Sequence, residues 1–565
     1  MHPPVDRPLP GVALPRPSPA TPPGPLDERL YDLVEARVRR LLHDNPVAAT
    51  MRGIHTEDHR LGDGSRDAVL AELAAERTHL AAIEALDDDG LSPMARFERD
   101  LEVHNLRQVL FELDEVRRWE HAGTAAATVG DGIFLLFARG AAPLAERLER
   151  IADRLEAAPG FIEASKSRLL GVPVRVWQGV EARYADDLPG MVAEIVTAAE
   201  ADGTMAPAEL ARLRRAGEQA VEALGEYAAW LRETMADADD GWPLGRERYA
   251  EMVRLRAFGD LDPDSILAIG TDQLHASLEA RRAAARELDP TRDPLAVIDR
   301  LKDDHPTTFE EALDGYRDVM RRAREFVVER GIATVPDDER VDVIETPGFL
   351  QAVMPFAAYY DPARFDADQR ALYVVTRAVD GDPAAMREHY WAAISNTSIH
   401  EAYPGHHLQL AIAARHPSLT RMLTEAPEFV EGWGMYSEQM MREEGFDDGP
   451  AFRVAMYTDV IWRACRIILD IRMHRGELTP AEATDFLVEH TAFEPSVARA
   501  EVRRYTYTPG YQLSYLLGKV LILGLREEER RRRGDGFSLR RFHDTLLRNG
   551  SLPISFHRRL LREEA

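Results

Sequence analysis

Helical periodicity runs through nearly the whole chain and is interrupted once, and this pattern limits the fold more than any other feature. Segments such as 92–119 and 263–288 are rich in Ala, Leu, Glu and Arg, with apolar residues three and four positions apart. The interruption at 331–377 is instead rich in β-branched residues, aromatic residues and prolines. The strand candidates within it are Val341–Glu345, Gln351–Tyr360 and Ala371–Thr376. We therefore expect a mainly α fold with one small β-sheet.

The expected helices divide into two lobes. The first 26 residues are dense in proline and lack the apolar core of a signal peptide, so they predict a disordered tail at 1–26. The acidic run at 237–240 reads as a loop between helical halves. It predicts an N-terminal helical lobe at 27–240 and a C-terminal lobe at 241–565 that contains the sheet, at about 341–376.

Charge and cysteine content exclude several classes of function. A net charge of −27 argues against nucleic acid or an anionic membrane as the main partner. The only cysteine, Cys465, excludes an intrachain disulfide and a Cys-rich zinc module, so any metal must be bound by His and carboxylate side chains. A single cysteine also fits a reducing compartment, and we expect a cytoplasmic protein.

The sequence H-E-A-Y-P-G-H-H, which begins at His400, resembles a metal-binding peptidase helix with unusual spacing. His407 lies on the same face of a regular helix as His400, but roughly 10 Å further along the axis. That is long for two imidazoles that each bind zinc at about 2 Å. A bulge at Pro404 and Gly405 would bring His406 into place instead. Spacing therefore leaves His406 and His407 as alternatives and favours His406, and a chance cluster of structural histidines is the remaining explanation.

A third metal ligand is expected from the acidic stretch E-F-V-E-G-W-G-M-Y-S-E, which supplies Glu428, Glu431 and Glu438. Glu431 is the preferred candidate because Gly432 and Gly434 allow a close approach of the backbone. Glycine is unfavourable within a helix, by up to about 1 kcal/mol relative to Ala, so two of them there suggest a reason in packing or function.

Groups for acid–base and oxyanion chemistry also lie near these motifs in sequence. Glu401, beside His400, would point to the open metal position, where a carboxylate can take a proton from bound water and pass it to a leaving amine. The segment 501–519 concentrates tyrosine and arginine around a Pro-Gly break, and such side chains can stabilise an oxyanion. Its candidates are Arg503, Arg504, Tyr505, Tyr507, Tyr511 and Tyr515.

Three motifs together resemble those of a known family. H-E-A-Y-P-G-H-H-L-Q, E-G-W-G-M-Y-S-E and R-Y-T-Y-T-P-G-Y-Q-L-S-Y-L-L-G-K occur in the order typical of the bacterial domain of unknown function 885 (DUF885). That family is grouped with gluzincin-type zinc metallopeptidases, near the carboxypeptidase Taq and oligopeptidase group. The resemblance covers about residues 27–560. It implies a large, two-lobed, gluzincin-like helical fold with the small sheet beside the active-site helix.

The resemblance also implies roles for individual residues. His400, His406 and Glu431 would bind one Zn²⁺ per chain, and Glu401 would be the general base. Family motif positions without an assigned role are occupied by Gln409, Tyr436, Arg504, Tyr505, Tyr515 and Lys519, of which Arg504, Tyr505 and Tyr515 are our catalytic candidates. The chain departs from the family pattern at Tyr511, where the family often has Gln.

These observations predict a zinc-dependent hydrolase, a metallopeptidase-like enzyme that cleaves amide bonds of short peptides or peptide-like small molecules by means of a Glu-activated, zinc-bound water. Two alternatives stay open. A set of two histidines and one carboxylate also suits iron or manganese in a non-peptidase enzyme. The chain could also be a helical scaffold whose peptidase motif has lost its activity.

Overall fold

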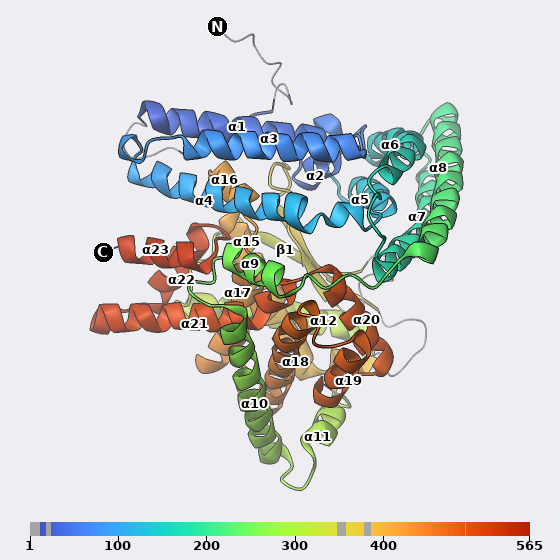
Figure 1. Ribbon diagram of the computed structural model, residues 1–565. Helices are drawn as coiled ribbons and strands as arrows, with labels where there is room; N and C mark the ends of the chain where they lie inside the picture. The colour runs from blue at the N-terminus through green and yellow to red at the C-terminus, as the bar shows by residue number, and fades with distance from the viewer. Residues whose placement is uncertain are drawn as a thin grey trace. The chain divides into compact units, whose positions relative to one another are not determined.

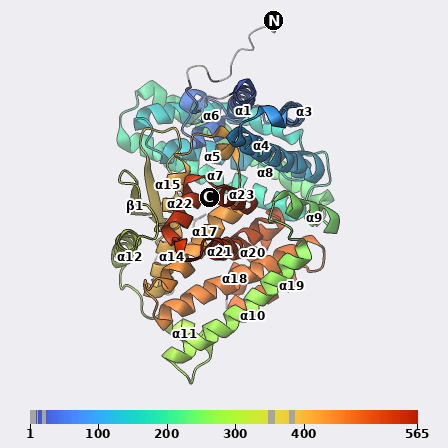
Figure 2. The same cartoon turned by 90° about the vertical axis from the view of Figure 1, so that its left-hand side faces the viewer.

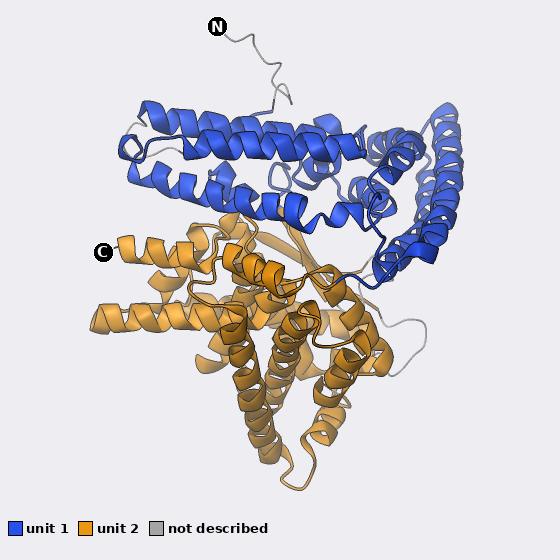
Figure 3. Cartoon of the chain, viewed as in Figure 1, with its two compact units in different colours: residues 1–242, 363–369, 417–423 blue, residues 243–362, 370–416, 424–565 orange. Residues whose placement is uncertain are grey.

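The computed structural model describes residues 9, 12–17, 24–346, 357–377, 386–491 and 493–564. Helices dominate these residues, and the strands form one small sheet (Figure 1, Figure 2). The mainly α fold expected from the sequence is thus confirmed. The chain divides into two compact units (Figure 3): unit 1 comprises residues 1–242, 363–369 and 417–423, and unit 2 comprises residues 243–362, 370–416 and 424–565.

Unit 1 is built from helices whose apolar faces pack on one another. Its α-helices are α1 (Pro25–Asp44), α2 (Pro46–Met51), α3 (Arg66–Glu84), α4 (Pro93–Leu110), α5 (Ala125–Ala138), α6 (Leu144–Lys166), α7 (Arg175–Asp202), α8 (Pro207–Thr234) and α16 (Leu419–Leu423). The start of α4 follows directly from its sequence, because the Ser92 side chain accepts a hydrogen bond from the Ala95 N–H and Pro93 occupies the first turn. Leu148, Leu155 and Leu224 are fully buried in the core that α5 to α8 share.

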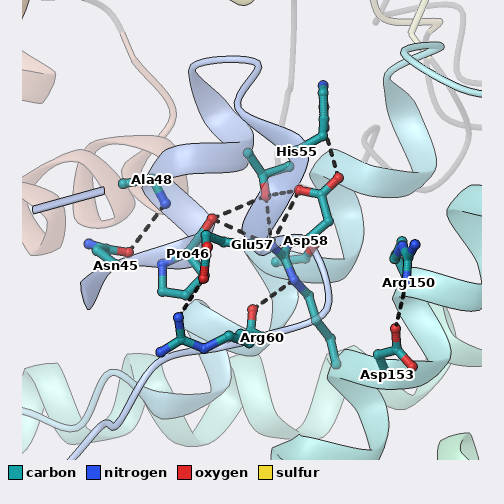
Figure 4. Close-up of polar contacts among 12 residues, drawn as sticks. Asn45, Pro46, Ala48, His55, Glu57, Asp58, Arg60, Arg150 and Asp153 are labelled. Atoms are coloured by element: carbon teal, nitrogen blue, oxygen red, sulfur yellow. Dashed lines mark hydrogen bonds and ion pairs between the residues drawn. The ribbon is translucent and has the colours of Figure 1, made fainter. Parts of the chain in front are cut away.

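Two short segments from later in the chain belong to unit 1. Within the segment 363–369, the Asp366 carboxylate lies 2.7 Å from Nε2 of His55. The other ring nitrogen of His55 bonds Asp58 (Figure 4). Within 417–423, the Arg421 guanidinium donates to buried Glu98. Ionic contacts between residues about 300 positions apart therefore hold both segments in place.

Unit 2 contains the sheet and the C-terminal helices. Its α-helices are α9 (Arg246–Leu255), α10 (Pro263–Leu288), α11 (Pro294–Leu301), α12 (Phe309–Arg330), α14 (Trp391–Glu401), α15 (His406–Ala413), α17 (Pro427–Glu443), α18 (Pro450–His474), α19 (Pro480–Thr491), α20 (Pro495–Tyr507), α21 (Ser514–Arg533), α22 (Leu539–Arg548) and α23 (Ile554–Glu563). α10 packs extensively against α18, and α17 packs extensively against α21. The second of these pairs contributes to the main core of the unit, around Phe429 and Trp433.

The sheet has the strand order β1-β3-β2, with β1 (Arg340–Glu345) parallel to β3 (Arg370–Val375) and β2 (Ala357–Tyr360) antiparallel to β3. Strands were expected in these three places, and the expected segment 351–356 lies outside the described residues. The side chain of Tyr373 in β3 is fully buried. β1 packs against α12, and β2 contacts α14, the helix that carries His400.

None of the described helices is by itself long and apolar enough to cross a membrane; the segments 93–120 and 125–138 meet that criterion only as a pair bent by 110°.

Candidate metal centre

His400 and His406 lie on two different helices, separated by a tight break. His400 is in the last turn of α14, and His406 is the first residue of α15. The Gly405 N–H donates back to the Ile399 carbonyl at 3.1 Å. A Cβ atom at Gly405 would overlap the carbonyl oxygen of His400, so only glycine fits here. The bulged helix expected from the sequence is therefore replaced by two helices joined by residues 402–405.

This break brings His400 and His406 together with Glu431 of α17. The Nε2 atoms of His400 and His406 lie 3.6 and 3.5 Å from the same oxygen, Oε2 of Glu431. All three ligand atoms lie within 4.8 Å of one another. Two ligand atoms bound tetrahedrally to zinc at about 2.0–2.1 Å are about 3.4 Å apart. The distances from Glu431 to the two histidines are thus close to the spacing of zinc ligands, and are too long for good direct hydrogen bonds.

Glycine in α17 makes room for this arrangement. A Cβ atom at Gly434 would come 2.6 Å from Cε1 of the His400 ring. A Cβ atom at Gly432 would come 2.5 Å from the backbone carbon of Gly518 in α21. The two glycines therefore allow α17 to contact the His400 ring on one side and α21 on another, and this close approach was expected from the sequence.

Two carboxylates lie against the His400 ring, one from Glu431 and one from Glu438. Its Nδ1 atom lies 2.6 Å from Oε1 of Glu438, so this second acidic residue of α17 orients the ring rather than joining the three-residue cluster. Burial lowers the pKa of His400, but Glu431 and Glu438 outweigh this effect and raise it to about 10. Burial raises the pKa of Glu431, whereas His400 and His406 lower it well below its ordinary value. The glutamates thus favour the protonated form of His400, and the histidines favour the ionised form of Glu431.

Glu401 follows His400 directly and faces the sheet. Its Oε2 atom accepts a hydrogen bond from the backbone N–H of Tyr359 in β2, at 3.2 Å. Glu401 is not one of the three clustered residues. It is instead a carboxylate beside the cluster, held by the edge strand of the sheet.

His407 belongs to a different group of side chains. Its Nε2 atom lies 2.7 Å from Glu339, and its Nδ1 atom lies 3.3 Å from the Tyr359 hydroxyl. Burial raises the pKa of Glu339, but hydrogen bonds from His407, Tyr403 and Arg324 outweigh this and lower it to about 2. With both ring nitrogens occupied, His407 lies outside the cluster, and His406 takes the position beside Glu431.

The remaining acidic candidate, Glu428, is also separate. Its Oε2 atom accepts a hydrogen bond from Arg256 at 2.8 Å, and the residue is 1% exposed. The three glutamates considered as ligands thus have different roles: Glu428 bonds Arg256, Glu431 faces His400 and His406, and Glu438 bonds the other side of the His400 ring.

Two of the three proposed catalytic residues of segment 501–519 contact another cluster. The buried Tyr505 hydroxyl donates to Glu501 at 2.9 Å and accepts a hydrogen bond from Arg466. Arg504 donates to the same Glu501 at 3.0 Å, and its side chain is 42% exposed. The Tyr515 ring lies under Arg466, and burial raises the pKa of its hydroxyl. The observed contacts therefore place Tyr505 and Arg504 around Glu501 rather than around Glu431.

Tyr511 instead contacts the metal-binding candidate, which we did not predict. Its hydroxyl donates to Oε1 of Glu431 at 2.9 Å, and its ring packs edge-on against Tyr515 at 5.9 Å. Burial and the charge of Glu431 raise the pKa of the Tyr511 hydroxyl, which keeps it a hydrogen-bond donor. From the sequence, Tyr511 was one of six oxyanion candidates around the Pro-Gly break and a departure from the family pattern, and neither signal pointed to Glu431.

Comparison with known proteins agrees with this fold. The chain belongs to the family described as bacterial proteins of unknown function (DUF885), whose profile matches residues 46–561. No curated protein matches it significantly.

Two solved structures have a similar fold. One is a candidate lipoprotein of unknown function from Shewanella oneidensis, with 22% identity and a TM-score of 0.78 over 94% of this chain and 99% of that chain. The other is a candidate lipoprotein from Colwellia psychrerythraea, with 19% identity and a TM-score of 0.76 over 95% of this chain and 99% of that chain. At these identities the likeness shows the fold alone.

Proposed function

We propose that the chain is a zinc-dependent hydrolase of the metallopeptidase type, which cleaves amide bonds in short peptides or peptide-like small molecules. The observation that carries this proposal is the spacing of His400 Nε2, His406 Nε2 and Glu431 Oε2, which leaves room for a cation and forms no short direct hydrogen bond. Two histidines and one carboxylate are also a common ligand set of catalytic zinc, which keeps a further position open.

The protein groups around this cluster suit hydrolysis. When bound, zinc would act as a Lewis acid that polarises a substrate carbonyl and acidifies water. Glu401 would accept a proton from water and return it to the leaving amine, and the Tyr359 N–H bonded to its Oε2 would orient the carboxylate. Glu438 would hold the His400 ring with Nε2 directed at the cation. Arg504 and Tyr515 remain candidates for contact with substrate, whereas Tyr505 is fully buried and would act only through its partners Arg466 and Glu501.

The first test is the metal content of the purified chain after dialysis, followed by activity on a set of short peptides. We expect about one zinc per chain. The Glu401→Gln variant should keep this metal but lose about 10²- to 10⁴-fold in turnover, because it keeps the shape of the side chain and loses the base. Undiminished turnover in Glu401→Gln would reject Glu401 as the base.

The metal analysis also separates the alternatives. Iron or manganese at one per chain, with activity that depends on oxygen, would favour a non-peptidase metalloenzyme that uses the same three ligands. A chain that binds no divalent metal under any loading condition would favour an inactive scaffold.

Glu425→Gln is a matched control for Glu401→Gln, because Glu425 lies just before α17 and outside the cluster.

The cellular location is part of the proposal. The single, buried Cys465 supports the cytoplasm. The description of the two structural neighbours as candidate lipoproteins supports the cell envelope instead. We propose the cytoplasm on the evidence of this chain's own residues. Cell fractionation tests this, and recovery of the chain with the membranes would overturn it.

A further inference from the structure

We infer that Tyr511 is a positioning residue that limits Glu431 to a single metal-binding oxygen. This inference rests on the proposed function, because it concerns how the same site would bind its cation. It assigns a role to a residue at which the chain departs from the family pattern, and it is carried by hydrogen bonds in the described part of unit 2.

The two oxygens of the Glu431 carboxylate have different environments. Oε2 lies 3.6 Å from His400 Nε2 and 3.5 Å from His406 Nε2, whereas Oε1 accepts a hydrogen bond from the Tyr511 hydroxyl at 2.9 Å. A carboxylate can bind a metal through one oxygen or through both. With Oε1 bonded to Tyr511, only Oε2 is directed at the two histidines. The hydrogen bond therefore favours a low coordination number and an open position for substrate.

The backbone before Tyr511 is fixed by buried charged groups. Gly510 has φ of +77°, a conformation that glycine adopts readily, and its N–H donates to Oδ2 of Asp470 at 2.8 Å. Asp470 is fully buried and also accepts a hydrogen bond from the Tyr249 hydroxyl. The carbonyl of Gly510 accepts a hydrogen bond from Arg256 at 3.2 Å. The turn is thus held at both its N–H and its carbonyl.

Arg256 links this turn to the helix that carries Glu431. Its Nη2 atom donates to Glu428 at 2.8 Å and to the Ser514 hydroxyl at 3.1 Å. Glu428 lies one turn before Glu431 in α17, and Ser514 begins α21 just after Tyr511. The Arg256 guanidinium thus bonds the first turn of α17, the first residue of α21 and the turn at Gly510. These bonds fix the position of the Tyr511 hydroxyl relative to the Glu431 carboxylate.

The test is to load the full-length chain with Co²⁺ and record its visible absorption, which weakens as the coordination number of cobalt rises. In Tyr511→Phe, Oε1 of Glu431 is free to bind, so we expect the bands to shift and lose intensity at full cobalt occupancy. Asp470→Asn disturbs the turn without touching Glu431 and should cause a smaller change in the same direction. Tyr184→Phe, at a 46% exposed tyrosine in unit 1, should leave the spectrum unchanged.

The outcomes separate the two proposals. If the wild-type chain binds no Co²⁺, both the proposed function and this inference fail. If the wild-type chain binds Co²⁺ and Tyr511→Phe gives the same spectrum at equal occupancy, the inference alone fails. If Tyr511→Phe has the wild-type cobalt spectrum but a lower kcat than the wild type, Tyr511 acts on the substrate and does not position Glu431.

Discussion

Two clusters of histidine and carboxylate, one in each unit, use the same side chains in opposite ways. In unit 1, His55 lies 2.7 Å from both Asp58 and Asp366, so each ring nitrogen has a direct partner. In unit 2, His400 and His406 stop 3.5–3.6 Å from Glu431. The first cluster is closed by its own hydrogen bonds, and the second keeps a space between its atoms. Spacing, more than residue type, therefore separates a structural ion pair from a candidate metal site.

In unit 2, side chains from outside the cluster bond two of its members. Glu438 holds the far side of the His400 ring, and Tyr511 holds the far oxygen of Glu431. In unit 1, the far oxygen of Asp58 is also held, by the Thr50 hydroxyl at 2.6 Å, but both nitrogens of His55 bond the acidic residues directly. In unit 2, Glu438 takes the Nδ1 atom of His400 and leaves only Nε2 to face Glu431.

The largest expected effect comes from removing one histidine of the open cluster. His406→Ala should lower zinc affinity by more than about a hundredfold, because loss of an outer partner alone typically costs 10- to 100-fold. Titration of the chain against a chelating dye measures this. His407→Ala is the matched control: it removes the neighbouring histidine, which bonds Glu339, and should leave zinc affinity within a few-fold of the wild type. The reverse result would move the ligand to His407.

A smaller effect is expected from the restraint behind His400. Glu438→Gln keeps the length of the side chain but removes its charge, so we expect zinc affinity to fall by about tenfold. Glu443→Gln changes a glutamate of the same helix that pairs with Arg526, and its zinc affinity should match that of the wild type. Equal affinities for the two variants would show that the Glu438 carboxylate does not support the site.

The smallest effect concerns the closed cluster of unit 1 and its pH dependence. Hydrogen bonds to Asp366 and Asp58 outweigh burial and raise the pKa of His55 to about 9, from an ordinary value of 6.5. A raised pKa in the folded state means that this stabilisation is complete below about pH 6.5 and is lost as the pH rises through 9. His55→Gln should therefore lower the Tm at pH 6 and lower it by less at pH 9.5. The expected loss at pH 6 is only about 1–3 °C, because this side chain is 36% exposed and its charge is screened by solvent.

Calorimetry of both proteins at the two pH values measures this difference, and a gap that widens with pH would contradict the assignment. Zinc binding should not change in His55→Gln, which completes the contrast with His406→Ala.

Most of the fold was predictable, because local patterns determine it. The helices expected within 92–119 and 263–288 begin at the caps Ser92 and Asp262, since short polar side chains accept hydrogen bonds from free N–H groups. The strands at Val341 and Ala371 follow from β-branched residues in a chain otherwise rich in helix formers. The return of 363–369 and 417–423 to unit 1 depends on partners about 300 residues away, which periodicity does not reveal.

The arrangement of the site was predictable only in part. The structure brings His400, His406 and Glu431 together, the set that the family resemblance implied. Spacing alone favoured His406 but left His407 open, and Gly432 and Gly434 favoured Glu431. The contact of Tyr511 with Glu431 was not foreseen, because α20 ends at Tyr507 and a turn at Gly510 redirects the chain. Helical spacing therefore carries no information across that turn.

The glycine contact between α17 and α21 has a mechanical consequence. A Cβ atom at Gly518 would overlap the carbonyl oxygen of Glu428, so the two backbones touch without side chains between them. Because the backbones of α17 and α21 are in direct contact, neither helix can slide along the other without a steric clash. The two helices therefore behave as one rigid body. Glu431 and the helix that follows Tyr511 would therefore swing together in any breathing motion of unit 2. Local unfolding of this helix pair would displace Glu431 and Tyr511 in a single step.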